Sequence, residues 1–307
     1  MNKVGIAIVS PSAYAPDEEA YFTGLRFLES QSCKVYSYYS PEKKYLRFGA
    51  TDEERIKQIH EAAKNDDVKI ILALRGGYGC SRIIPHLDFN LLADSGKLLV
   101  GFSDITALHL AMLAKANACS FAGPMLCSDF GRNPICMPTC DYFWQCVTSP
   151  SHTVYWEIPK NDVGINEDID VSGTLWGGNL SIFTHLLGTP YFPKIKDGIL
   201  FLEDVNEHPY RIERMMLQLF YAGVLSGQRA IVLGDFSGVE TTGYDNGYNV
   251  ETMLSYLRSV IPPPILTGLP FGHIERKITL AVGSKANLYS SKMRCTLEMT
   301  DYPYVRK

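Results

Sequence analysis

Three residues whose types suit nucleophilic catalysis lie where apolar runs of this sequence end. Ser103 stands in GFSDITALH, between the apolar run 98–100 and a helical pattern. Glu203 ends the strand that we expect over GILFL, and His273 follows LPFG at the end of another expected strand. A serine nucleophile needs a base that takes its proton and an anion that orients this base and offsets its charge. The three residues supply these roles, and the same set occurs in different chain orders on unrelated folds.

Each residue also has a simpler structural interpretation. A serine before a helix is a favoured N-cap, which typically contributes about 1 kcal/mol. Glu203 or the adjacent Asp204 could cap the helix that begins near His208. A lone histidine such as His273 is more often a structural or surface group. Taken singly, each residue favours the structural interpretation, and only the complete set favours catalysis.

A glycine-rich turn, Arg75-Gly-Gly-Tyr-Gly79, follows the apolar run KIILAL. It lacks the G-K-[ST] ending of a P-loop, and a G-x-G-x-x-G pattern read from Gly77 meets Arg82 where the third glycine should be. Nucleotide binding is therefore disfavoured. Glycines after a strand let backbone N–H groups approach a ligand or form an anion-binding concavity. A plain tight turn is the alternative.

The composition excludes several classes of function. The formal net charge is −4 without a dense Lys/Arg block, so we expect no nucleic-acid partner. No apolar run approaches the roughly 20 residues of a membrane-spanning helix, and VGIAIV reads as a first strand, not a secretory signal. The eight cysteines are scattered without C-x-x-C pairs, so we expect free thiols and a cytoplasmic protein. The histidines form no H-E-x-x-H or comparable pattern, so we expect no metal site, and we expect no cofactor.

The elements that must position these residues alternate between strand and helix patterns. This alternation predicts an α/β protein whose N-terminal domain is a doubly wound parallel sheet. Since 307 residues exceed the usual size of one core, we expect two domains. We predict an N-terminal domain over 1–150, a proline-rich and polar linker over 151–170, and a C-terminal β/α domain over 171–307. Ligands of open sheets gather at the carboxyl ends of strands, where the glycine turn and Ser103 fall.

Six blocks of the sequence, in order from Val4 to Leu288, together identify a resemblance to the LD-carboxypeptidase family, serine peptidases of the murein tetrapeptide carboxypeptidase type. The resemblance implies an active site in the cleft between the two domains, with Ser103, Glu203 and His273 as the catalytic residues. It also implies an oxyanion hole formed by the backbone N–H groups of Gly77 and Asp104, and a position for Asn179 that lines the site. The blocks are LALRGGYGCSRIIPHLD, GFSDITALH, FAGPM, GTLWGGNLSIFTHLLGTPYFPKI, GILFLEDVNEHPYRIERMMLQL and LPFGHIERKITLAVGSKANL.

Members of this family remove the terminal D-alanine from murein tetrapeptides and yield tripeptides for cell-wall recycling, and the resemblance further implies a homodimer. Such an enzyme must bind a terminal carboxylate, for which Arg75 is a candidate; a structural ion pair is its alternative role. Some family members instead cleave microcin-type peptidyl nucleotides and give self-immunity, for which an aromatic element at 142–144 is a candidate. A catalytically silent ligand-binding protein on the same fold is a third possibility. The sequence leaves open whether diaminopimelate or lysine occupies the third stem position, and which glycan or nucleotide is attached.

Overall fold

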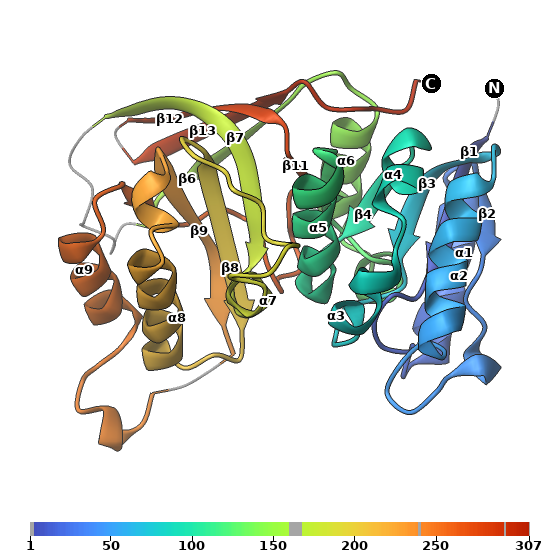
Figure 1. Ribbon diagram of the computed structural model, residues 1–307, viewed down its shortest axis with the longest axis horizontal. Coiled ribbons are helices and arrows are strands. Elements are labelled where there is room, and N and C mark those ends of the chain that lie inside the picture. Colours follow the sequence, from blue (N-terminus) through green and yellow to red (C-terminus); the bar gives the residue numbers. More distant parts are fainter. Residues whose placement is uncertain (1–2, 160–167, 239–240, 292, 307) are drawn as a thin grey trace.

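Two β-sheets form the framework of the protein in the computed structural model, which describes residues 3–159, 168–238, 241–291 and 293–306 (Figure 1). The first sheet has six strands in the order β11-β5-β4-β3-β1-β2. Its strands are β1 (Val4–Val9), β2 (Cys33–Ser37), β3 (Val68–Ala73), β4 (Leu98–Gly101), β5 (Ser120–Ala122) and β11 (Leu280–Val282).

The first sheet is doubly wound, as the sequence predicts. Strands β1 to β5 pair in parallel. The chain moves from β1 outward to β2 and then back past β1 to β3, and right-handed crossovers place the helices of these two steps on opposite faces. The direction of winding therefore reverses between β1 and β3. In sheets of this kind, ligands bind at the carboxyl ends of the strands beside that switch point.

The second sheet has seven strands in the order β10-β9-β8-β7-β12-β13-β6. The β7 to β10 half pairs in parallel, and β7, β12, β13 and β6 pair antiparallel. Its strands are β6 (His152–Glu157), β7 (Ile169–Asn179), β8 (Ile199–Val205), β9 (Ala230–Ser237), β10 (Ile265–Leu266), β12 (Lys285–Ser291) and β13 (Arg294–Thr300).

Helices connect and cover the strands, and side-chain caps begin several of them. Asp17 accepts backbone N–H groups at the start of α1, Asp88 at the start of α4 and Asn249 at the start of α9, as short polar side chains do at N-cap positions. The helices are α1 (Glu18–Ser30), α2 (Asp52–Lys64), α3 (Cys80–Ile83), α4 (Phe89–Asp94), α5 (Thr106–Ala116), α6 (Met137–Val147), α7 (Leu180–His185), α8 (Pro209–Tyr221) and α9 (Val250–Val260).

The stretch expected as a linker is partly a strand. Residues 152–157 form β6, which pairs with β13 at the edge of the second sheet. Its alternation of buried and exposed residues suits an edge strand with one buried face. Residues 160–167 of the same stretch lie outside the described residues. Strand β11 belongs to the C-terminal half of the chain, but it pairs antiparallel with β5 in the first sheet.

No helix among the described residues is long and apolar enough to cross a membrane. All eight cysteines are free thiols, as the sequence predicts.

Candidate active site

Ser103 lies in a strained turn between strand and helix. Strand β4 is fully buried, and a 3₁₀ turn (Ser103–Ile105) leads from it into α5. The φ angle of Ser103 is +63°, a left-handed conformation that is uncommon for a residue with a side chain and that costs free energy. The side chain caps neither the 3₁₀ turn nor α5. The N-cap interpretation therefore does not describe Ser103, whereas the strained conformation is typical of a nucleophile elbow.

Gly76 lies against Ser103. A Cβ atom added to Gly76 would lie 2.8 Å from the Cβ and 2.9 Å from the Oγ of Ser103. No larger residue fits there without displacing the serine. The glycine turn after β3 is thus in direct contact with the elbow after β4, and this contact gives a packing reason for the first glycine of the turn.

Glu203 lies near the carboxyl end of β8 and is completely buried. The pairing of β8 with β9 shifts register between Leu202 and Asp204, an irregularity of the kind that re-aims a side chain. One carboxylate oxygen of Glu203, Oε2, lies 2.8 Å from Nδ1 of His273. The other, Oε1, accepts a hydrogen bond of 3.1 Å from Nδ2 of Asn179.

His273 lies in an irregular segment, so the expectation that it ends a strand is wrong. Strand β10 ends at Leu266, and Gly268 and Gly272 have φ angles of +81° and +135° that no regular strand contains. The segment is nevertheless anchored, because the N–H of Asp235 donates to the carbonyl of Phe271 at 2.8 Å. The His273 side chain keeps 23% of its surface exposed.

The imidazole also packs against the residue that precedes the candidate nucleophile. The rings of His273 and Phe102 have centroids 5.0 Å apart and meet edge to face. Glu203 is therefore hydrogen-bonded directly to His273. Among the hydrogen bonds and ring contacts of the described residues, His273 contacts the turn that carries Ser103 only through the ring of Phe102. The hydrogen bonds between described residues include none from Ser103 to His273. Catalytic hydrogen bonds are often long before substrate binds and tighten in the complex.

Asn179 contacts the Glu203 carboxylate, and Asp204 holds Asn179 in place. Asp204 accepts hydrogen bonds from the N–H and the hydroxyl of Ser181, at the start of α7, and from Nδ2 of Asn179. Asn179 is the N-cap of α7 and accepts the N–H of Ile182. Neither Glu203 nor Asp204 caps α8, whose N-cap is His208 without a side-chain cap bond. Asp204 thus supports α7, a role that the sequence did not indicate.

Gly77, a candidate oxyanion donor, and Arg75, the candidate for binding the substrate carboxylate, lie in the same glycine turn. Gly77 has a φ angle of +112°, and a Cβ atom added there would lie 3.0 Å from Ala13 and 4.0 Å from Nη2 of Arg75. Arg75 is half-buried and donates to the carbonyl of Tyr14 at 3.4 Å. Arg75 forms none of the ion pairs between described side chains. The structural ion pair that was its alternative role is therefore not formed among them.

Three buried charged side chains near the site, those of Lys277, Asp129 and Arg55, have no sequence signal. Lys277 and Asp129 form an ion pair with almost no exposed surface, and Nζ of Lys277 lies 4.4 Å from the ring centroid of Phe102. Arg55 is fully buried beside the glycine turn. No local pattern marks these positions as buried charges, so only the tertiary fold shows that they are internal. Within the described parts of the chain, no group of three or more His, Cys, Asp or Glu side chains is placed to hold a metal ion.

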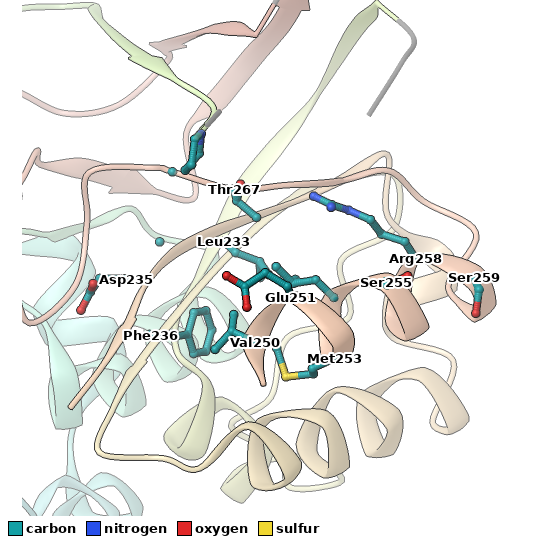
Figure 2. Close-up of a pocket in the computed structure, with 14 residues that line it drawn as sticks. Leu233, Asp235, Phe236, Val250, Glu251, Met253, Ser255, Arg258, Ser259 and Thr267 are labelled. Atoms are coloured by element: carbon teal, nitrogen blue, oxygen red, sulfur yellow. The ribbon is translucent and has the colours of Figure 1, made fainter. Parts of the chain in front are cut away.

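A cavity of about 640 Å³ lies between the end of β9, helix α9 and the segment at Thr267, and Figure 2 shows the residues that line it. Its described lining includes the apolar side chains of Leu233, Phe236 and Met253. Gly234 forms part of its wall, and a Cβ atom added there would lie 3.4 Å from the Cβ of Glu203. Ser103, Glu203 and His273 do not line it among those residues. The cavity therefore adjoins Glu203 at Gly234 without including the three candidate catalytic residues in its described lining.

The two-sheet α/β fold carries a strained serine, a glycine turn against it and a buried carboxylate bonded to an imidazole. This combination defines a class of proteins equipped for acyl transfer by a serine. Comparison with known families is more specific. Residues 6–123 match the model of the LD-carboxypeptidase N-terminal domain, and residues 172–288 match that of the LD-carboxypeptidase C-terminal domain. The chain belongs to the LD-carboxypeptidase family.

Named relatives span nearly the whole chain. A probable murein peptide carboxypeptidase of Bacillus subtilis (strain 168) is 30% identical over 294 residues, which cover 95% of this chain and 91% of the relative. The crystal structure of muramoyltetrapeptide carboxypeptidase from Oxalobacter formigenes is 48% identical, with a TM-score of 0.92 over 98% of this chain and 100% of that one. The microcin C7 self-immunity protein MccF of Escherichia coli is 27% identical over 92% of this chain and 89% of its own.

Proposed function

We propose that this protein is a serine LD-carboxypeptidase that hydrolyses the terminal D-alanine from murein tetrapeptides and releases tripeptides. One observation carries the proposal: the buried Glu203 binds Nδ1 of His273, and this imidazole packs on Phe102 immediately before the strained Ser103. The murein peptide carboxypeptidase of Bacillus subtilis and the muramoyltetrapeptide carboxypeptidase of Oxalobacter formigenes support the choice of substrate.

In the proposed mechanism, Glu203 holds Nδ1 of His273 and leaves Nε2 as the base. Nε2 takes the proton of Ser103 as Oγ attacks the carbonyl carbon that precedes the terminal D-alanine. The N–H groups of Gly77 and Asp104 receive the oxyanion. The C–N bond then breaks, D-alanine leaves with the proton from His273, and water repeats the cycle on the acyl-enzyme. The site would occupy the cleft between an N-terminal domain and a C-terminal domain joined near residues 151–170.

A carboxypeptidase differs from an endopeptidase in that it binds the terminal carboxylate of its substrate, and we assign this binding to Arg75. A Cβ atom built on Gly77 would lie 4.0 Å from Nη2 of Arg75, and the described hydrogen bond of Arg75 to Tyr14 uses one of its donors. Arg75→Ala should remove most of the preference for a tetrapeptide over its C-terminal amide. Arg82→Ala is the matched control, because Arg82 pairs with Asp52. Equal discrimination in Arg75→Ala and wild type would exclude Arg75.

The decisive experiment is mass spectrometry of a murein tetrapeptide digest, in which the wild type should remove one alanine. Ser103→Ala should lower kcat by about 10⁴ or more. A fluorophosphonate probe should label the wild type and fail to label this variant. A Ser103→Ala enzyme with wild-type activity would overturn the proposal, and so would a folded wild type that neither reacts with the probe nor cleaves the peptide.

The cell-wall role carries further expectations that rest on the family resemblance. We expect a cytoplasmic homodimer that acts in peptidoglycan recycling on a small peptide, without nucleic acid, metal or cofactor. The alternative is cleavage of a microcin-type peptidyl nucleotide, for which the aromatic segment 142–144 was the candidate element. The surroundings of this segment give the alternative less support. Phe143 is fully buried and packs on Phe130 with ring centroids 5.4 Å apart, as a core residue does. Comparing kcat/KM for a tetrapeptide and an aminoacyl sulfamoyl nucleoside distinguishes the two substrates.

A further inference from the structure

We propose that the side chain of Asp104 is a positioning residue, which holds the glycine turn 76–79 against Ser103 and thereby fixes the oxyanion donors. This inference rests on the proposed function. It concerns the carboxylate of Asp104, whereas the oxyanion hole uses the backbone N–H of the same residue.

The Asp104 carboxylate connects the ends of three neighbouring strands. Asp104 follows β4, and its Oδ2 accepts the backbone N–H of Cys80 at 2.9 Å, at the far end of the glycine turn after β3. The same oxygen accepts the hydroxyl of Ser12 at 2.5 Å, in the loop after β1. These strands lie side by side in the order β4-β3-β1. One buried oxygen therefore links all three loops at the switch point of the sheet.

A buried guanidinium supports the same turn from the other side. Nη1 of Arg55, on α2, donates to the carbonyls of Gly79, at 3.0 Å, and of Pro11. Nη2 of Arg55 is paired with Asp52 at 2.6 Å. The turn is thus held through a carbonyl by Arg55 and through an N–H by Asp104. Its glycines give it no side chains with which to hold its own conformation. These ties at the Gly79–Cys80 peptide, together with the N–H of Ala13 that donates to the carbonyl of Gly76 at 3.4 Å, therefore fix where Gly77 lies.

The environment of Asp104 is poorly suited to stability alone. The residue is 1% exposed, and its second oxygen, Oδ1, is buried without a hydrogen-bond partner among the described residues. A buried polar atom without a partner destabilises the folded state. A carboxylate at this position is therefore better explained by the geometry that Oδ2 imposes. Buried charged residues that weaken the fold are expected where they position functional groups.

The tether should act on the chemical step. An oxyanion donor displaced by about 1 Å loses much of its effect, and loss of one donor costs about 10²–10³ in rate. Asp104→Ala should lower kcat by about 10²-fold and leave KM within about threefold. Asp104→Asn can keep Oδ1 of the amide where Oδ2 of the carboxylate lay, so it should restore kcat to within about tenfold of wild type.

The test measures kcat and KM for a murein tetrapeptide, together with thermal unfolding. The variants are Asp104→Ala, Asp104→Asn and Ser12→Ala, with Leu28→Ala on α1 as a control that destabilises the same sheet away from the turn. Ser12→Ala removes one donor from Oδ2 without touching the peptide backbone, and it should lower kcat about three- to tenfold. If Asp104→Ala does not fold, Asp104→Asn and Ser12→Ala decide the question.

The expected result is a fall in kcat for Asp104→Ala and Ser12→Ala that exceeds the fall in an equally destabilised Leu28→Ala, with recovery in Asp104→Asn. A kcat within threefold of wild type in Asp104→Ala or, if that variant does not fold, in Ser12→Ala overturns the inference. Equal loss in Asp104→Ala and Asp104→Asn also overturns it, because the charge would then matter more than the tether. Ser103→Ala separates the two proposals: if that variant is active, the proposed function fails first.

Discussion

Replacing Glu203 by glutamine tests which nitrogen of His273 serves as the base. The wild-type carboxylate accepts on both oxygens, from Nδ1 of His273 at 2.8 Å and from Nδ2 of Asn179 at 3.1 Å. A glutamine amide accepts on one side and donates on the other. The orientation of this amide therefore depends on whether Asn179 is free to turn.

Asn179 is fixed by its other bonds. Its Nδ2 also donates to Asp204 at 2.9 Å, and its Oδ1 accepts the N–H of Ile182 at 3.2 Å as the N-cap of α7. Turning the Asn179 amide would break both contacts. The oxygen of the glutamine must therefore face Asn179, and its NH₂ must face Nδ1 of His273. Nδ1 then becomes an acceptor, the ring proton moves to Nε2, and Nε2 can no longer take the proton of Ser103.

The expected loss follows from this change of tautomer. The equivalent aspartate-to-asparagine change in a Ser-His-Asp enzyme costs about 10⁴ in kcat. We expect a fall of about 10³–10⁴ for Glu203→Gln, which corresponds to about 4–5.5 kcal/mol of transition-state stabilisation. KM should change little, because the carboxylate is buried behind the imidazole.

The assay is D-alanine release from a murein tetrapeptide, measured with thermal unfolding of each variant. Asp204→Asn is the matched control: it is a neighbouring buried carboxylate that binds Asn179 and Ser181 but not His273. This control should lose stability and keep kcat within about tenfold of wild type. A Glu203→Gln enzyme within tenfold of wild-type kcat would show that the Glu203–His273 contact is structural.

Three further outcomes are expected. Gly76→Ala should fold but lose at least about 10²-fold in kcat, measured by steady-state kinetics, since its Cβ would lie 2.8 Å from the Cβ of Ser103. Burial lowers the pKa of His109 to about 4. Between about pH 6.5 and 4 the unfolded chain therefore binds more protons than the folded protein. Up to about 3 kcal/mol of the free energy of unfolding is lost as the pH falls through this window. Urea unfolding at both ends of the window should show this loss in wild type and a flatter profile in His109→Gln. Incubation with a chelator should leave peptide hydrolysis unchanged, and complete inactivation reversed by a divalent metal would refute the serine mechanism.

Local pattern was sufficient to predict the parallel strands β1 to β5 of the first sheet, but not the addition of β11. The run 98–100 is buried because a central parallel strand is covered on both faces, and such strands are continuously apolar in sequence. The helical pattern after it and the serine between them then predict a strand, a turn and a helix, which are β4, the 3₁₀ turn and α5. The candidate residues could be chosen at the same stage, because polar side chains that follow apolar strands collect at one edge of a parallel sheet.

Long-range pairing was not predictable in the same way. Strand β6 lies in a stretch whose prolines and polar residues indicate a linker, and its partner β13 is more than a hundred residues away. The segment before His273 reads as a strand, but its glycines with positive φ turn it into an anchored loop. The tethers from Asp104 and Arg55 join loops after different strands, so no local spacing indicates them.

The position of His273 depends on both sheets at once. Its segment leaves the second sheet at β10 and enters the first sheet at β11, so each end is fixed to a different sheet. Within it, Lys277 is paired with Asp129 beneath the Phe102 ring that contacts the imidazole. Beside it, the N–H of Asn179 donates to Oγ1 of Thr106, on α5, at 2.9 Å. A shift of one sheet against the other would therefore move the imidazole relative to Ser103, so changes at these contacts should alter kcat through the placement of the imidazole.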